Sequence, residues 1–201
     1  MRQSNAQLSG HYENSSPTQA SAYIGQQRVV PEYAPSEKVI LNYELVNRGF
    51  FQPQAFRTLV KGISDSGARV LFDTNSLTAS ESTYRAFLTS SYGVDANSAS
   101  KSEFVNPITE SREALFWARD YAPIYAWSSQ TKKMRLLDFN YYPARATNDS
   151  IAQAIAQKYR LERVSIPIYM EGGNFMINGD GLCVVTKHVN DFNNPDANRW
   201  L

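Results

Sequence analysis

The sequence has few of the residue types that build metal centres and disulfide frameworks. It contains one cysteine, Cys183, and two histidines, His11 and His188. A single cysteine excludes an internal disulfide and a cysteine-rich zinc site, and two histidines argue against a His-ligated metal centre. We therefore expect no metal centre. No cofactor is predicted.

The chain also lacks an excess of charge and a long apolar run. Its 20 Lys and Arg residues nearly balance its 19 Asp and Glu residues, so no electrostatic attraction to nucleic acid or to an anionic membrane is expected. No run of about 18 apolar residues is present, which excludes a predicted membrane-spanning helix. No apolar segment follows Arg2, so no secretory signal is predicted. We expect a soluble protein, and the compartment stays open between secreted and cytoplasmic.

The composition is that of one globular domain with a short leader. The chain has 201 residues, of which 42% are hydrophobic, enough for a core. Residues 1–30 are rich in Ser, Asn and Gln and hold few core-type residues, which predicts a disordered leader. Residues 31–201 are expected to form the folded part.

The first half of the folded part predicts a strand–helix–strand unit. Residues 38–43 and 68–73 are apolar strand candidates, and a helix between them begins at Pro53 and ends at Gly67. That helix carries apolar residues at helical spacing: Phe56, Leu59, Val60 and Ile63. Such a unit favours a parallel sheet covered by helices. A second helix is predicted from Ser80 to near Gly93, with Tyr84, Phe87 and Leu88 on one face.

The second half predicts two hairpins with a helix and a strand between them. Residues 94–103 are small and polar and predict a loop. One hairpin joins residues 124–127 to 134–139, and another joins 175–177 to 182–186 around an Asn-Gly-Asp-Gly turn. Between the hairpins, Asp149 predicts the N-cap of a helix through Arg160, with Ile151, Ile155 and Tyr159 on one stripe, and residues 164–170 predict a strand. The fold class is therefore α/β or mixed α+β.

Two short segments carry candidate chemistry. In residues 116–123 an arginine and an aspartate, Arg119 and Asp120, stand among aromatic residues at the start of a strand. If the segment is extended, neighbours face opposite sides, so only one of them faces a given pocket. A carboxylate walled by Trp117 suits a planar cation, because it accepts paired hydrogen bonds while the ring packs on the flat group. Taken alone, the segment is more typical of a solvated charged pair beside an ordinary buried tryptophan.

The second segment is Met-Glu-Gly-Gly-Asn at residues 170–174. Gly172 and Gly173 allow a backbone turn that residues with a Cβ resist. They place Glu171 at the end of a buried strand, where a carboxylate needs a cation or a histidine as its partner. Taken alone, this segment is more typical of a plain turn with an exposed glutamate.

Together the two segments are far more specific. Trp-x-Arg-Asp-x-x-Pro, followed about 50 residues later by Glu-Gly-Gly-Asn and a hairpin, resembles the guanidino-group-modifying enzymes, a superfamily recognised by such spaced motifs. The resemblance is to the branch of agmatine deiminases and bacterial, Porphyromonas-type peptidyl-arginine deiminases, and it covers roughly residues 31–190. Residues 31–37, Pro-Glu-Tyr-Ala-Pro-Ser-Glu, also resemble the start of that domain.

The resemblance implies a fold and a reaction. The fold is an α/β propeller of five pseudo-symmetric blades, the pentein fold, of which two to three blades are expected here. The reaction is hydrolysis of a guanidinium to a ureido group and ammonia, through attack of a cysteine thiolate and with a histidine as general acid and base. Peptidyl-arginine is the expected substrate. The alternative is agmatine, whose product, N-carbamoylputrescine, leads to putrescine.

The resemblance also assigns roles to individual residues. Asp120 corresponds to a guanidinium-binding aspartate, and Glu171 to the glutamate that orients the catalytic histidine. Trp117 is expected to wall the substrate pocket, and Asn174 to lie on its substrate side. Arg119, Gly172 and Gly173 are expected to be structural.

A further arginine points to the substrate. Residues 138–145, which end at Arg145, resemble the peptidyl-arginine deiminase form of a loop whose arginines hold a substrate carboxylate. Only Arg145 remains here, because Pro143 stands where the other arginine is expected. The alternative is a solvated loop arginine.

The nucleophile and the histidine of this reaction have no match in the chain. Cys183 lies between apolar neighbours and is expected to be a buried structural cysteine. His188 belongs to His-Val-Asn-Asp, whose spacing does not fit the His-x-Asp of the family, and it is expected to be an ordinary loop residue. We therefore expect a catalytically inactive N-terminal portion. It could be a fragment that lacks its C-terminal half, one half of a split enzyme with a completing chain, a domain that binds arginine without turning it over, or a structural remnant.

Overall fold

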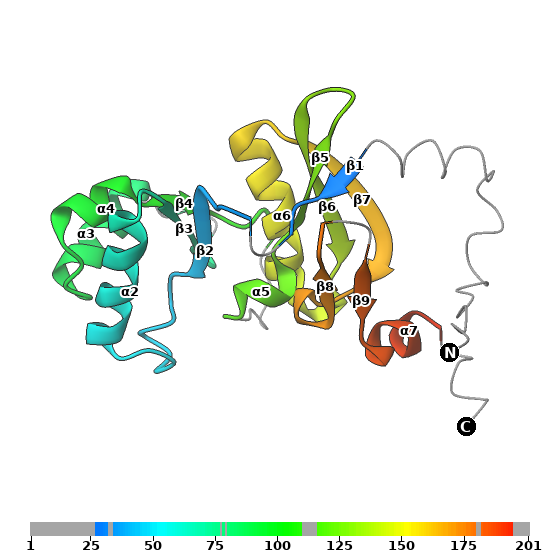
Figure 1. Cartoon of the computed structure of the whole chain (residues 1–201). Helices are drawn as coiled ribbons and strands as arrows, with labels where there is room; N and C mark the ends of the chain where they lie inside the picture. Colours follow the sequence, from blue (N-terminus) through cyan, green and yellow to red (C-terminus); the bar gives the residue numbers. More distant parts are fainter. Residues whose placement is uncertain are drawn as a thin grey trace, which may run out of the picture.

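A computed structural model describes residues 27–31, 34–76, 78, 80–109, 116–179 and 182–194 of the chain. Most of the predicted leader, part of the Pro-Glu-Tyr start and part of the Asn-Gly-Asp-Gly turn lie outside the described residues. The described elements form a mixed α/β arrangement with three sheets (Figure 1). The predicted α/β class is thereby confirmed.

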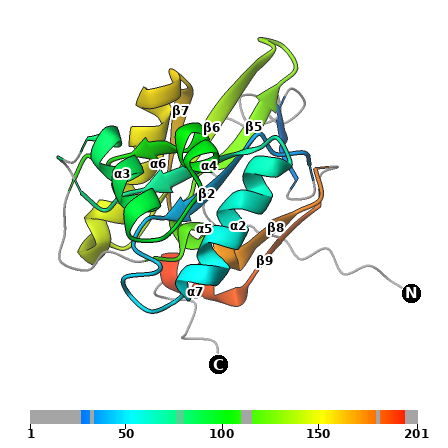
Figure 2. The same cartoon turned by 90° about the vertical axis from the view of Figure 1, so that its left-hand side faces the viewer.

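The first sheet is parallel and has the order β2-β3-β4. Strand β2 (Lys38–Asn42), helix α2 (Pro53–Asp65) and strand β3 (Arg69–Asp73) form the predicted strand–helix–strand unit. Helix α3 (Glu81–Ser90) and strand β4 (Glu103–Val105) follow, and β4 pairs with β3. Helices α2 and α3 lie against one face of this sheet, at the left of Figure 1 and in front in Figure 2.

Helix α2 has the predicted bounds. Pro53 occupies the first turn, and Gly67, with a φ of +88°, directly follows the C-terminal cap. Phe56 and Val60 are completely buried, whereas Leu59 is exposed. Leu59 therefore lies outside the apolar stripe in which the sequence placed it.

The prediction of a loop over residues 94–103 is wrong. The side chain of Asp95 accepts a hydrogen bond of 2.9 Å from the backbone N–H of Ser98 and so caps a short helix, α4 (Ala96–Lys101). Strand β4 begins two residues after this helix. A helix of this length has no apolar periodicity, so its cap is the only local signal for it.

The second sheet has the order β1-β5-β6-β7. Strands β5 (Ile124–Ser128) and β6 (Lys133–Asn140) form the predicted hairpin, and β7 (Glu162–Tyr169) pairs with β6 in parallel. Strand β1 (Gln27–Val29) pairs with β5. This strand precedes residue 31, where the sequence predicted the folded part to begin. It forms by pairing with the distant strand β5, which the local sequence pattern does not reveal.

Helix α6 (Ala146–Tyr159) connects β6 to β7 and starts earlier than predicted. Asp149 is not its N-cap. It lies in the first turn, where its carboxylate accepts a 2.6 Å hydrogen bond from the backbone N–H of Tyr141. A 3₁₀ turn, η1 (Pro143–Arg145), precedes the helix, and Arg160 ends it in the left-handed conformation.

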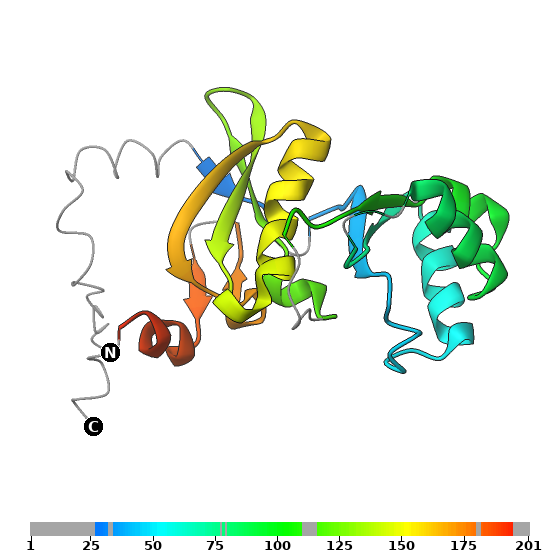
Figure 3. The ribbon, with the colours of Figure 1, turned by 180° about the vertical axis from the view of Figure 1, so that it is seen from behind.

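Helix α6 lies between the two sheets, as the view from behind shows (Figure 3). Its buried Ile151 and Ile155 pack in one cluster with Leu71 and Val105 of the first sheet and Leu136 of the second. Its small residues Ala152, Ala154 and Ala156 are buried as well. A helix buried on most of its circumference joins the two sheets into one body.

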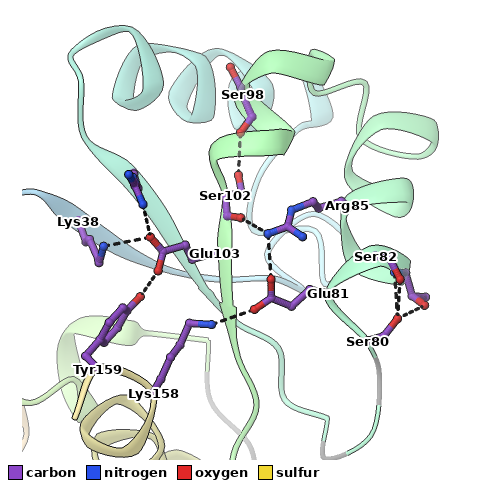
Figure 4. A network of polar contacts seen from close by, with 12 residues as sticks. Lys38, Ser80, Glu81, Ser82, Arg85, Ser98, Ser102, Glu103, Lys158 and Tyr159 are labelled. Atoms are coloured by element: carbon purple, nitrogen blue, oxygen red, sulfur yellow. Dashed lines mark hydrogen bonds and ion pairs between the residues drawn. The ribbon is translucent and has the colours of Figure 1, made fainter. Parts of the chain in front are cut away.

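A polar network supports the same junction (Figure 4). Glu103 of β4 accepts hydrogen bonds from Lys38 of β2, from Arg69 of β3 and from Tyr159 of α6, at 3.0, 3.1 and 2.5 Å. Burial alone would raise the pKa of Glu103, but these donors outweigh it and hold the pKa at about 2. Lys158 of α6 also pairs with Glu81 of α3 at 2.8 Å.

The third sheet is the predicted second hairpin, β8 (Phe175–Ile177) with β9 (Cys183–Val185), followed by helix α7 (Lys187–Asn193). Two expectations are wrong here. Cys183 is exposed, because no described element covers this part of the hairpin. His188 lies in helix α7 and not in a loop, because the polar residues after β9 close a helical turn.

Within the part of the chain that the structure describes, every helix is too short or too polar to cross a membrane.

Candidate active site

The Trp-x-Arg-Asp segment forms a single helical turn, α5 (Ala118–Tyr121), directly after Trp117. The prediction of an extended segment is therefore wrong, and so is the conclusion that Arg119 and Asp120 face opposite sides. Successive side chains of a helix are about 100° apart, and both residues line the same groove.

The Glu-Gly-Gly-Asn segment packs directly on α5. Its 3₁₀ turn, η2 (Gly172–Asn174), brings Gly172 so close to the carbonyl oxygen of Arg119 that a Cβ there would clash with it. A Cβ on Gly173 would lie 3.2 Å from Oδ1 of Asp120. The backbone angle φ is not positive at either residue. Close approach, rather than the turn conformation that the sequence suggested, therefore explains the two glycines.

Arg119 holds the two segments together. Its Nε donates to the carbonyl oxygen of Gly172 at 3.0 Å, and its Nη2 donates to that of Phe175 at 3.1 Å. These bonds join α5 to η2 and to the first residue of β8. The guanidinium of Arg119 therefore bonds to backbone carbonyls of the second segment.

Glu171 is oriented by two neighbours. Nδ2 of Asn174 donates to Oε2 of Glu171 at 3.0 Å, while Oδ1 of Asn174 accepts from the hydroxyl of Thr186 at 2.8 Å. The hydroxyl of Tyr142 also interacts with Glu171. The amide of Asn174, expected on the substrate side, is thus bonded to Glu171 and Thr186.

The charged residues of the site shift the pKa of Asp120 in opposite directions. Burial raises its pKa, and the negative charge of Glu171 raises it further, whereas the guanidinium groups of Arg119 and Arg145 lower it. Asp120 and Glu171 therefore lie close enough to repel each other. A cation placed between them would relieve this repulsion.

Arg145, whose charge acts on Asp120, lies against a pair of tyrosines. Its Nη1 donates to the hydroxyl of Tyr141 at 3.2 Å, and its guanidinium carbon lies 5.4 Å from the centre of the Tyr142 ring. The sequence analysis missed both tyrosines as site residues, although both belong to the loop that singled out Arg145. His188 reaches Tyr142 as well, with 3.3 Å between Nε2 and the tyrosine hydroxyl.

An open groove of about 490 Å³ leads to Asp120. Trp117 forms part of its wall and is 49% exposed, and Phe50, an exposed residue that the sequence analysis also missed, packs on it at 4.8 Å between ring centres. The remaining lining is mostly apolar: Ile40, Leu41, Leu45, Phe51 and Phe116. Among the described residues, no cluster of three or more His, Cys, Asp or Glu is arranged to hold a metal ion.

Solved structures with a similar fold include agmatine deiminases. Agmatine deiminase from C. jejuni matches with a TM-score of 0.60 and 18% identity, over 86% of this chain and 50% of that one. Agmatine deiminase of Enterococcus faecalis matches with a TM-score of 0.57 and 17% identity, over 82% of this chain and 44% of that one. At this identity the likeness establishes the fold. The chain spans about half the length of these deiminases.

The sequence itself identifies the family. Residues 30–200 match the Porphyromonas-type peptidyl-arginine deiminases. The chain belongs to this family, as the paired motifs indicated.

Proposed function

We propose that the chain is the N-terminal portion of a guanidino-group deiminase that acts on peptidyl-arginine. The observation that supports this most is the docking of η2 on α5, which brings Glu171 close enough to act on the charge of Asp120, the carboxylate that lines the groove with Trp117. The propeller of the family, with two to three blades in this chain, is part of the proposal.

The site suits a planar cation. The carboxylate of Asp120 accepts hydrogen bonds from the N–H groups of a guanidinium, which fit a carboxylate in pairs. Trp117 packs against the flat face of the cation. Glu171, already oriented by Asn174, orients and charges the histidine that exchanges protons during hydrolysis.

The thiolate and that histidine are proposed to come from a completing segment or a second chain. In the reaction, the thiolate adds to the guanidinium carbon, ammonia leaves with a proton from the histidine, and water then releases the ureido product. Met176, Leu182 and Val184 expose an apolar surface on the β8–β9 hairpin, which suits contact with a completing part. Without it, the chain is a non-catalytic arginine-binding domain.

Binding of a guanidinium ligand tests the proposal. N-acetyl-arginine amide should bind to the full chain in a calorimetric or NMR titration, and N-acetyl-lysine amide should bind far more weakly, because an ammonium lacks the planar pairs of donors. Asp120→Asn should reduce the affinity at least about tenfold. Asp65→Asn, an exposed carboxylate on α2, is the matched control and should change nothing. Equal affinity of wild type and Asp120→Asn would refute the proposal.

The agmatine deiminases of the same fold make agmatine the second candidate substrate. Arg145, beside Asp120, favours a substrate that carries a carboxylate. Arg145→Ala should therefore lower the affinity for a dipeptide with C-terminal arginine about tenfold, the typical effect of a lost charge-assisted hydrogen bond. The affinity for agmatine should not change. If agmatine binds more tightly than the dipeptide to the wild-type chain, the agmatine alternative is favoured.

A further inference from the structure

A buried carboxylate lies beneath the groove, at the carboxyl ends of β2 and β3. Asp73 is completely inaccessible to solvent, as is Asn42 beside it. Three donors surround the carboxylate of Asp73: the hydroxyl of Tyr121 at 2.6 Å, the backbone N–H of Asn75 at 3.2 Å and Nδ2 of Asn42 at 3.3 Å. No step of the proposed reaction uses this group.

Burial of the Asp73 carboxylate lowers the stability of the fold. Burial, together with the negative charge of Glu44, raises its pKa to about 6 against the opposing effect of its three donors. A buried carboxylate with neutral donors contributes less to stability than an apolar residue of similar size. Core packing therefore does not account for an acidic residue here.

The contacts of Asp73 lead to the candidate active site. Tyr121, its closest partner, is the last residue of α5 and follows Asp120 directly. Asn42, its second partner, lines the same groove as Asp120. A helix of four residues does not hold itself in place, so α5 depends on its side-chain contacts. Gly172 packs on one part of α5, and Asp73 holds Tyr121 at another.

We propose that Asp73 is a positioning residue for Asp120, which it holds in place for guanidinium binding through the Tyr121 hydroxyl and helix α5. This inference rests on the proposed function, because it concerns the same site. The groups that act on Asp73 are Tyr121 from α5, Asn42 and Glu44 from the end of β2, and Asn75 after β3. Asn148 of helix α6 is a further hydrogen-bond partner of Tyr121.

Two conservative variants of the full chain test the proposal. Tyr121→Phe keeps the ring and removes the donor, and Asp73→Asn removes the charge. Each should weaken binding of N-acetyl-arginine amide about tenfold. In a chain that already carries Asp120→Asn, each variant should lower the affinity hardly any further, because the effects of substitutions at coupled residues are not additive. Leu88→Ala, a completely buried core residue of α3, destabilises the fold without touching α5 and should bind like wild type.

A pH titration separates positioning from general stability. The backbone amide signals of residues 118–122 should shift with a midpoint near pH 6 in wild type and in Asp120→Asn, because Asp73 titrates there. This step should vanish in Asp73→Asn and persist in Leu88→Ala. If Asp73→Asn and Tyr121→Phe bind like wild type, or lose no more affinity than Leu88→Ala, the inference is wrong. If wild type binds no guanidinium, the proposed function fails, and the amide titration alone decides whether Asp73 controls α5.

Discussion

At the scale of single residues, Asp120 and Cys183 define what this chain is able to do. Asp120 is a partly buried carboxylate whose pKa is raised by burial and by the negative charge of Glu171, and on the proposed function a cationic ligand relieves that repulsion. Cys183, by contrast, is an exposed residue of the β8–β9 hairpin. Its neighbours partly bury the thiol, and this partial burial raises the pKa of the thiol. A thiol with a raised pKa is a poor nucleophile at neutral pH.

Cys183 is therefore expected to be dispensable. Cys183→Ser, or alkylation of Cys183 by iodoacetamide, should leave the affinity for N-acetyl-arginine amide unchanged, because no contact joins the thiol to Asp120 or Glu171. The chain alone should release no ammonia from this ligand, as an ammonia assay would measure. Turnover that Cys183→Ser abolishes would make Cys183 the nucleophile, contrary to the assignment made here.

At the scale of elements, the site depends on the contact between α5 and η2. Neither element is long enough to be stable alone: α5 has four residues and η2 has three. Their contact is possible only because Gly172 has no Cβ. The bonds of Arg119 then hold the two turns together. The spacing of the two motifs in the sequence therefore reflects one structural contact.

Gly172→Ala should break this contact. The added methyl group would clash with backbone rather than with a flexible side chain. We therefore expect the free energy of unfolding to fall by about 2–3 kcal/mol and guanidinium binding to be lost. Urea unfolding and ligand titration measure both effects. Gly62→Ala, inside α2 with nothing within 4 Å of the added methyl group, is the matched control and should stabilise the chain by about 0.5–1 kcal/mol. Equal effects of the two substitutions would contradict the role given to Gly172.

At the scale of the whole molecule, helix α6 holds the two larger sheets in one body. Its apolar residues pack on both sheets, and its last residues, Lys158 and Tyr159, reach Glu81 of α3 and Glu103 of the first sheet. Asp73 and Asn42 come from the first sheet, whereas Glu171 follows the second. The relative position of the sheets therefore sets the geometry of the candidate active site.

Glu103→Gln should weaken this junction. Because the pKa of Glu103 falls from 4.5 to about 2 on folding, its contribution is present above pH 4.5 and disappears as the pH falls towards 2. The variant should lose about 2–3 kcal/mol at neutral pH, and its stability should fall less steeply between pH 4.5 and 2 in urea unfolding. Glu162→Gln removes a more exposed ion pair with Arg135 and should cost less than about 1 kcal/mol. A wild-type stability that stays constant over this pH range would disprove the assignment.

The sequence by itself determined the local elements and the family. Helix α2 and the two hairpins follow from periodicity, Pro53, Gly67 and turn residues, because these signals act between neighbours in the chain. The paired motifs around Asp120 and Glu171 identified the family, because their residue types and spacing need no coordinates. The guanidinium-binding roles of these residues remain predictions.

The tertiary structure alone decided which distant groups meet. The bond between Asp73 and Tyr121, the clash that excludes a Cβ at Gly172 and the bonds of Arg119 to the carbonyls of Gly172 and Phe175 join residues far apart in the sequence. The exposure of Cys183 belongs to the same class, since the same apolar neighbours in sequence are compatible with a covered or an uncovered strand. Burial and contact depend on how the sheets pack around α6, and packing is a property of the whole fold.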